Sequence, residues 1–193
     1  MMKKHDNRKQ QILLSVVIAF IMVSSVIGFM FGREEQNTVE YNKIKFYQKN
    51  FLWATKINGQ EVVFHNFPTA VEYLNISDDI YTKIKSTLEI DSTYDQNNSY
   101  VEEIAGIQYE LEMVLNNFFN IYLRKGLTDE NKYNLPMITC DDATPVVPVL
   151  YFKTGNRTEV YLENNCIIAE AKNGVDLLKI KDRIILGLLG IME

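Results

Sequence analysis

A long apolar run near the N-terminus is the strongest pattern in the chain. Residues 12 to 31, ILLSVVIAFIMVSSVIGFMF, contain no charged residue, and only three serines and one glycine interrupt the apolar side chains. At about 1.5 Å rise per residue, a helix of this length spans about 30 Å, the thickness of the hydrocarbon core of a bilayer. The pattern predicts a transmembrane helix from Ile12 to Phe31.

Two other interpretations of this run stay open. A cleaved signal peptide has an apolar run of about 7 to 15 residues and a small-x-small cleavage site, whereas this run is longer and ends in bulky residues. A buried helix of a soluble domain is the second alternative. We expect an uncleaved signal-anchor.

The charges that flank the run predict its orientation. Four basic residues and one aspartate precede it, whereas one arginine and two glutamates follow it. Because positive charge is retained on the cytoplasmic side, the N-terminus is expected inside. Residues 1–11 then form a cytoplasmic tail, 12–31 the single membrane span, 32–42 a polar tether, and 43–193 an extracytoplasmic domain at the cell membrane.

The pair Asn58-Gly59 lies between two segments rich in aromatic and β-branched residues. Asn-Gly supplies the two positive φ angles of a type I′ turn, so the pair predicts a β-hairpin. The register that this turn sets places Trp53 opposite Phe64 as an aromatic pair.

The middle of the domain shows apolar residues at helical spacing. They recur from Ser99 to about Leu123, which is typical of an amphipathic helix packing on a sheet. Short apolar segments at 86–90 and 135–139 lie on either side of it. Strand, long helix, strand predicts a right-handed βαβ crossover, with these two strands as parallel neighbours.

Further strands are predicted at 146–152, 159–162 and 166–171, and a final helix from Val175 to Leu189. Together with the hairpin they predict the fold class as α/β, or mixed α+β. The expected architecture is one domain with a mixed sheet, packed by the long central helix and the C-terminal helix.

Thr144-Pro145, followed by a strand, a turn, a strand and a terminal helix, resembles the second half of the thioredoxin fold. The resemblance covers about residues 144 to 190. The Cys-x-x-Cys of that family is missing, because residues 92–98 read SerThrTyrAspGlnAsnAsn at the head of the long helix. The resemblance therefore implies a thioredoxin-like fold and no redox activity.

Composition excludes several classes of protein. The chain has 193 residues, of which 47% are hydrophobic and 23% are charged, as in ordinary folded proteins. After the apolar run there are 16 basic and 24 acidic residues, a net charge of -8. Nucleic-acid binding normally needs a basic face, so a nucleic-acid partner is not expected.

Catalytic motifs are scarce. The chain has two histidines, His5 and His65, so a multi-histidine metal centre within one molecule is excluded. We interpret His65 as a partly exposed strand residue. Asp182 and Arg183, in the middle of the last helix, are interpreted as a surface or semi-buried charge pair.

Four carboxylates form the one candidate site for a ligand. If strands 86–90 and 135–139 are parallel, the loops after them open at the same edge of the sheet, where α/β proteins bind ligands. These loops carry Asp91 and Asp95, and Asp141 and Asp142. Their oxygens could coordinate a divalent cation such as Ca²⁺ or Mg²⁺. The alternative is ordinary turn chemistry, in which such side chains bond nearby backbone amides.

The chain has two cysteines, Cys140 and Cys166. An even number in an oxidising exterior favours a disulfide between them. Three Asn-x-Ser/Thr triplets, at Asn75, Asn97 and Asn156, also face the exterior in this topology, at about the frequency expected by chance.

Two functions from different classes fit these observations. The leading interpretation is a single-pass membrane protein whose extracytoplasmic domain has a non-catalytic binding or envelope-assembly role, with a protein partner that the sequence does not identify. The alternative is an extracytoplasmic enzyme or thiol-disulfide factor that uses Cys140 and the adjacent acidic loop. A reactive cysteine must carry thiolate character, so an unpaired, partly exposed Cys140 near a cation would favour the alternative.

Overall fold

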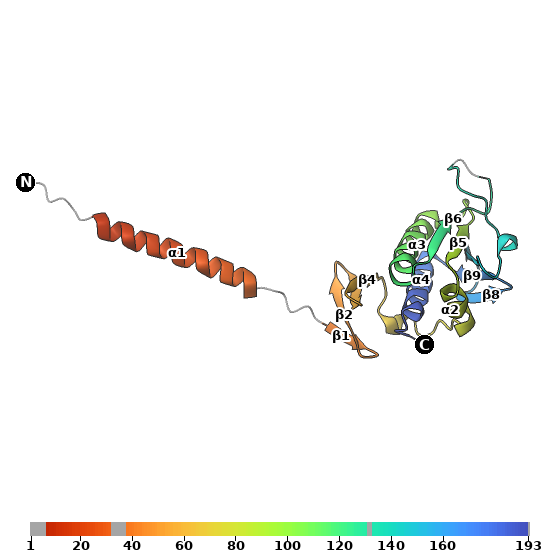
Figure 1. Ribbon diagram of the computed structural model, residues 1–193, viewed down its shortest axis with the longest axis horizontal. Helices are drawn as coiled ribbons and strands as arrows, with labels where there is room; N and C mark the ends of the chain where they lie inside the picture. The colour runs from red at the N-terminus through yellow and green to blue at the C-terminus, as the bar shows by residue number, and fades with distance from the viewer. Residues whose placement is uncertain (1–6, 32–37, 131–132, 193) are drawn as a thin grey trace, which may run out of the picture. The chain divides into compact units, whose positions relative to one another are not determined.

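The computed structural model describes residues 7–31, 38–130 and 133–192, and in the first of these ranges it describes side chains only from 11 to 26. The chain divides into two units, residues 1–37 and 38–193. In the first unit, residues Asn7–Phe31 form helix α1 (Figure 1). Within the described residues, no helix is long and apolar enough to cross a membrane.

A four-stranded antiparallel meander opens the second unit. Each of its three turns places two consecutive residues at positive φ, as type I′ hairpin turns require: Asn42 and Lys43, Asn50 and Phe51, Asn58 and Gly59. The hairpin predicted around Asn58-Gly59 is confirmed, with Trp53 opposite Phe64. The first strand begins at Thr38, inside the segment expected to be a tether. The strands are β1 (Thr38–Tyr41), β2 (Ile44–Lys49), β3 (Leu52–Ile57) and β4 (Gln60–Phe64).

A five-stranded mixed sheet forms the rest of the domain, in the order β6-β5-β7-β9-β8. Strand β5 lies parallel to β6 on one side and to β7 on the other, and β7 lies parallel to β9. Only β8, at the edge, is antiparallel. The strands are β5 (Glu89–Tyr94), β6 (Tyr122–Lys125), β7 (Val149–Thr154), β8 (Glu159–Glu163) and β9 (Cys166–Ala171).

The predicted crossover exists, but its second strand is a different one. Helix α3 (Val101–Val114) runs into a π-helical turn, η2 (Leu115–Phe119), and the helical path ends at Asn120, which has φ 54°. The chain then enters β6, so the helix predicted to continue to about Leu123 is too long. The predicted strand at 135–139 is wrong as well, because that segment makes only an isolated bridge between Leu127 and Met137.

The short elements mark the connections between these parts. A 3₁₀ turn, η1 (Pro68–Ala70), and helix α2 (Asp78–Lys85) join the meander to β5. Another 3₁₀ turn, η3 (Cys140–Asp142), lies in the long connection between β6 and β7. The last helix is α4 (Gly174–Leu188), close to the predicted boundaries.

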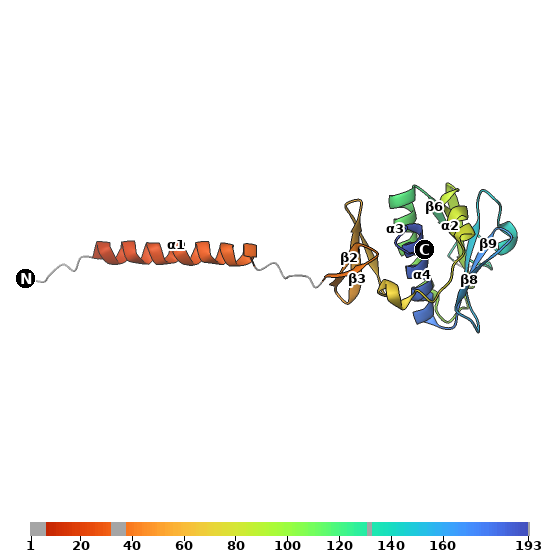
Figure 2. The same ribbon diagram turned by 90° about the horizontal axis from the view of Figure 1, so that it is seen from below.

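Helices α3 and α4 lie between the two sheets, with the meander on one side and the five-stranded sheet on the other (Figures 1 and 2). One core cluster joins all three layers, and it includes Phe46 and Phe64 from the meander, Ile104 from α3, Ile184 from α4 and Phe152 from the sheet. The described residues thus form two sheets and four α-helices, and a single mixed α+β domain follows α1.

The thioredoxin resemblance does not extend to the pairing of the strands. The two strands that carry it, β7 and β8, follow each other in sequence but are not neighbours. Strand β9 lies between them and pairs with both.

Candidate functional site

The face of the five-stranded sheet opposite α3 and α4 holds most of the residues singled out in the sequence. Side chains alternate along each strand, so Ile90 and Phe152 point to the helices. Val149 and Ile168 point the other way and pack against Ile138 in the connection that carries η3. We call this second face the disulfide face.

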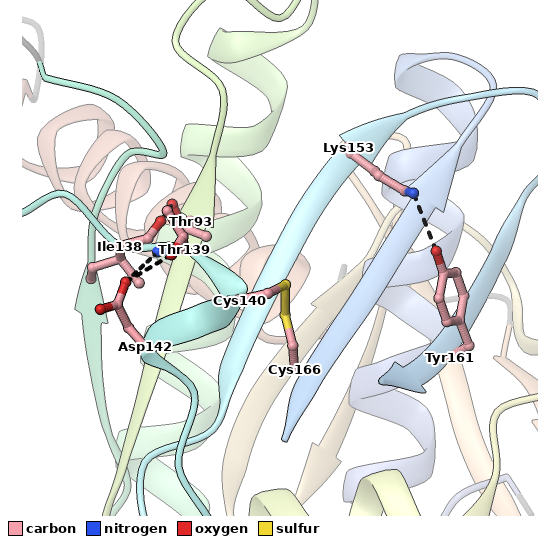
Figure 3. The surroundings of a disulfide bond; sticks show 8 residues. All are labelled: Thr93, Ile138, Thr139, Cys140, Asp142, Lys153, Tyr161 and Cys166. Atoms are coloured by element: carbon pink, nitrogen blue, oxygen red, sulfur yellow. Dashed lines mark hydrogen bonds between the residues drawn. A yellow bond between two sulfur atoms is a disulfide. The ribbon is translucent and has the colours of Figure 1, made fainter. Parts of the chain in front are cut away.

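The predicted disulfide between Cys140 and Cys166 is confirmed. The two Cα atoms are 5.2 Å apart, and the bridge joins η3 to the first residue of β9 (Figure 3). Cys166 is only 1% exposed. Among the described residues there is no free cysteine. The bridge therefore fixes η3 against the disulfide face and leaves no thiolate available there.

Asp91 lies inside β5, not in a loop after it, and its side chain is 1% exposed. Arg124, its neighbour in register on β6, donates from Nε and Nη2 to the two carboxylate oxygens, each at 2.7 Å. Bonding to Asp91 raises the pKa of Arg124. A bidentate arginine thus neutralises the carboxylate that the sequence assigned to a cation.

Asp141 and Asp142 lie in η3, and Asp142 closes a capping box. The backbone N–H of Thr139 donates to Asp142 Oδ2 at 2.8 Å, and its hydroxyl lies 3.0 Å from the same oxygen (Figure 3). These bonds to Thr139 lower the pKa of Asp142, and the charge of Arg124 acts in the same direction. Turn chemistry, the alternative weighed from the sequence, is what this part of the connection shows.

The fourth carboxylate, Asp95, lies apart from this group. It follows the last residue of β5, four residues beyond Asp91, which is about 13 Å along an extended strand. Its Oδ1 accepts from the backbone N–H of Asn97 at 2.7 Å. The structure therefore gathers Asp91 and Asp142 around Arg124 and leaves Asp95 at the other end of the strand.

The shared edge on which the four-carboxylate site depended does not exist, because 135–139 is not a strand beside β5. Within the described residues, no three histidine, cysteine or acidic side chains are placed to hold a metal ion. The binding of Ca²⁺ or Mg²⁺ itself stays a prediction, and a cation there would compete with Arg124 and with the Thr139 amide.

A second polar row crosses the disulfide face. Lys153 on β7 lies 3.2 Å from the hydroxyl of Tyr161 on β8 (Figure 3). Its Nζ also lies 3.0 Å from a carboxylate oxygen of Glu170 on β9. The ion pair with Lys153 lowers the pKa of Glu170 and raises that of Lys153. Each charge in the row thus has an intramolecular partner.

The interpretation of Asp182 and Arg183 as a surface or semi-buried pair is wrong. Lys181, Asp182 and Arg183 are all buried in α4, and they point to different elements. Arg183 donates from Nε to the carbonyl of Leu74 at 2.9 Å and from Nη1 to the hydroxyl of Tyr81 at 2.8 Å. The charges hold segments of the domain together, and they do not form a pair at the surface.

Lys181 and Asp182 connect α4 to the end of the meander. Lys181 Nζ lies 2.6 Å from Glu110 Oε2, 2.6 Å from Asp182 Oδ1 and 3.1 Å from the Nδ1 of His65. His65 is partly exposed as predicted, but it lies just after β4 and not in a strand. Asp182 Oδ2 accepts from the backbone and side-chain N–H groups of Asn66 at 2.7 and 2.8 Å. The signal that sequence reasoning missed is three consecutive charges inside an apolar helix.

Comparison with known proteins adds no assignment to this geometry. The chain matches no family model, no curated protein and no solved structure.

Proposed function

We propose that this chain is a single-pass membrane protein whose extracytoplasmic domain works by binding and not by catalysis. The observation that carries the proposal is the closed Cys140–Cys166 bridge, with Cys166 buried beneath η3. Disulfides persist in oxidising compartments, which agrees with a domain outside the cytoplasm. The bridge also removes the thiolate on which the alternative function depends.

The charged groups of the disulfide face support the same conclusion. The buried carboxylate of Asp91 is neutralised by Arg124, and Lys153 is held by Glu170. A general acid or base needs a pKa matched to its task and a proton to move at a substrate. Groups locked in internal ion pairs are suited to holding η3 and the sheet edge in one conformation.

The membrane anchor rests on the sequence. The uncharged run from Ile12 to Phe31 has the length of a bilayer core, and the basic residues lie on its N-terminal side. Protease added to intact cells should therefore degrade the C-terminal domain and leave a small membrane-bound fragment. Full protection of the domain would contradict the topology, and release of the intact chain by alkaline carbonate would contradict the anchor.

The alternative, a thiol-disulfide factor, has a test of its own. A Cys166→Ala variant frees Cys140, and a factor that exchanges disulfides would then accumulate mixed disulfides with other proteins. We expect the variant to run as a monomer on non-reducing gels, like the matched Cys140→Ala variant. A ladder of reducible adducts formed only by Cys166→Ala would support the alternative.

A further inference from the structure

The turn between β2 and β3 presents an aromatic side chain to solvent. Phe51 is 100% exposed, although most large apolar side chains of the domain are wholly or partly buried. It also has φ 66°, in the left-handed region, and the preceding Asn50 has φ 49°. Burial in the folded domain therefore does not account for this phenylalanine.

The other two turns of the meander have Lys43, at φ 66°, and Gly59, at φ 81°, in the position that Phe51 occupies in its turn. Glycine is favoured at the second position of a type I′ turn because it adopts positive φ at no steric cost, and Gly59 occupies that position between β3 and β4. A side chain with a Cβ at the same position is strained. Phe51 thus combines backbone strain with full exposure of an aromatic ring, which is explained if the ring is buried by a partner.

The meander also carries a charge opposite to the rest of the domain. Residues 38–64 contain four lysines and two glutamates, a net charge of +2, whereas residues 65–193 contain eleven basic and twenty acidic residues, a net charge of -9. The strand register places Lys45, Lys49 and Lys56 on one face, opposite the side of Phe46 and Phe64 that enters the core. Glu40 and Glu61 share this face, so lysines outnumber carboxylates there by three to two. All three lysines are exposed.

The path of the chain brings this part of the domain close to the predicted anchor in sequence. Thr38, the first residue of β1, pairs with Tyr47, so β1 begins at the same end of the meander as the Phe51 turn. Seven residue steps separate Phe31 from Thr38, and they reach at most about 25 Å. If Phe31 ends a membrane span, the Phe51 end of the meander is confined to the neighbourhood of the bilayer.

We propose that the meander binds the surface of an anionic lipid bilayer, with the Phe51 ring in the interface and the lysine face against the lipid phosphates. This inference rests on the proposed membrane anchor. Aromatic rings are favoured at the level of the headgroups, and lysines are attracted by anionic lipid. We choose lipid and not a second protein as the occupant, because the seven residue steps from Phe31 to Thr38 limit this end of the meander to about 25 Å from the predicted end of the membrane span.

The test uses the full chain in vesicles of phosphatidylcholine with a quarter phosphatidylglycerol. The chain has a single tryptophan, so a Trp53→Phe background carrying Phe51→Trp reports on the turn alone. The matched control is Trp53→Phe with Gln60→Trp, at the opposite end of the meander. Two quenchers are compared, brominated lipid from the bilayer and iodide from the water.

In the Phe51→Trp variant, we expect the indole to be quenched by brominated lipid and shielded from iodide. In the Gln60→Trp control, we expect the indole to be quenched by iodide and not by brominated lipid. Replacing Lys45, Lys49 and Lys56 by glutamine should weaken docking about fivefold per lysine, since each surface charge near an anionic leaflet has about that effect. Lys172→Gln, outside the meander, should have little effect, and vesicles of pure phosphatidylcholine should reduce docking as the lysine variants do.

Three outcomes would overturn the inference. If iodide quenches the two tryptophan variants equally and carbonate does not extract the chain from the vesicles, the turn does not contact lipid, but the proposed anchor still stands. An indole shielded from iodide but not quenched by brominated lipid indicates a second copy of the chain or another protein as the occupant. Extraction of the chain by carbonate contradicts both this inference and the proposed anchor.

Discussion

Replacing Lys181 by methionine tests whether the buried charges of α4 hold the domain together. Methionine keeps most of the length of the side chain and removes the ammonium group, which is fully buried and lies 2.6 Å from two carboxylates. Glu110 is partly exposed and can regain water, but Asp182 is 0% exposed. Its Oδ1 accepts no aligned hydrogen bond from any described residue, so it would be left without a charged partner.

Breaking a buried ion pair from one side costs about 3 to 5 kcal/mol in the free energy of unfolding. Since whole domains are stable by only about 5 to 15 kcal/mol, the loss would be a large fraction of the total. The matched control is Lys179→Met, two residues earlier in the same helix. Lys179 pairs with Asp176 at 3.1 Å and is partly exposed, so its removal should cost at most about 1 kcal/mol.

Urea denaturation of residues 38–193, which contain the whole core cluster, measures both variants. Trp53 fluorescence reports on the meander, and far-ultraviolet circular dichroism reports on the helices and the large sheet. Because Lys181 and Asp182 join α4 to His65 and Asn66, Lys181→Met should lower the fluorescence midpoint below that of the dichroism signal. An effect no larger than that of Lys179→Met would refute the reasoning, and adding Asp182→Asn should recover part of the loss if the coupling is electrostatic.

Three further predictions follow from the fold and the disulfide face. The bridge joins residues with a sequence separation of 26, so the Cys140→Ala and Cys166→Ala double variant should lose about 3.5 kcal/mol of unfolding free energy at 25 °C. A loss under about 1 kcal/mol would contradict the chain-entropy explanation of the stabilisation. Burial raises the pKa of Tyr81 to about 12, so the neutral phenol stabilises the folded state, and this stabilisation is lost as the pH rises from about 10 through 12. The free energy of unfolding should therefore fall less steeply over that pH range in Tyr81→Phe than in the unmodified protein. Equal slopes in the two proteins would argue against this effect of Tyr81. Ca²⁺ or Mg²⁺ should leave the melting temperature nearly unchanged, because Arg124 and Thr139 already hold the nearest carboxylates. A rise in melting temperature with either ion, lost in the Asp141→Asn and Asp142→Asn double variant, would instead support the predicted cation site.

Features that depend on neighbouring residues could be predicted from the sequence. The Asn58-Gly59 hairpin and the pairing of Trp53 with Phe64 were both predicted, because a two-residue turn fixes the register of the strands beside it. The same reasoning did not find the turn at Asn50-Phe51, where both residues also have positive φ but a phenylalanine occupies the position in which glycine is usual. Sequence rules recognise a type I′ turn by its preferred residues, such as Asn-Gly, so they do not recognise a turn that has a strained residue in the place of glycine.

Features that depend on competition between segments could not be predicted. The amphipathic pattern continues from α3 into residues 121–123, and these residues are as apolar as a helix face requires. Asn120 ends the helix by taking the left-handed conformation, and Leu123 then becomes part of a strand. The segments 122–125 and 135–139 could each have filled the place beside β5, and only tertiary packing decided between them.

The candidate site shows the same division between local and distant partners. The capping box of Asp142 uses Thr139, three residues away, so turn chemistry could be weighed from the sequence alone. The partner of Asp91 is 33 residues distant, and the link from Lys181 to His65 spans 116 residues. The local sequence does not indicate such distant partners. A charged residue between apolar residues therefore fits a surface ion pair, a ligand site or a buried ion pair equally well. A consecutive run of three charges within an apolar helix removes that ambiguity, since residues 181 to 183 spread around the helix at about 100° each and a buried helix cannot turn all three to solvent.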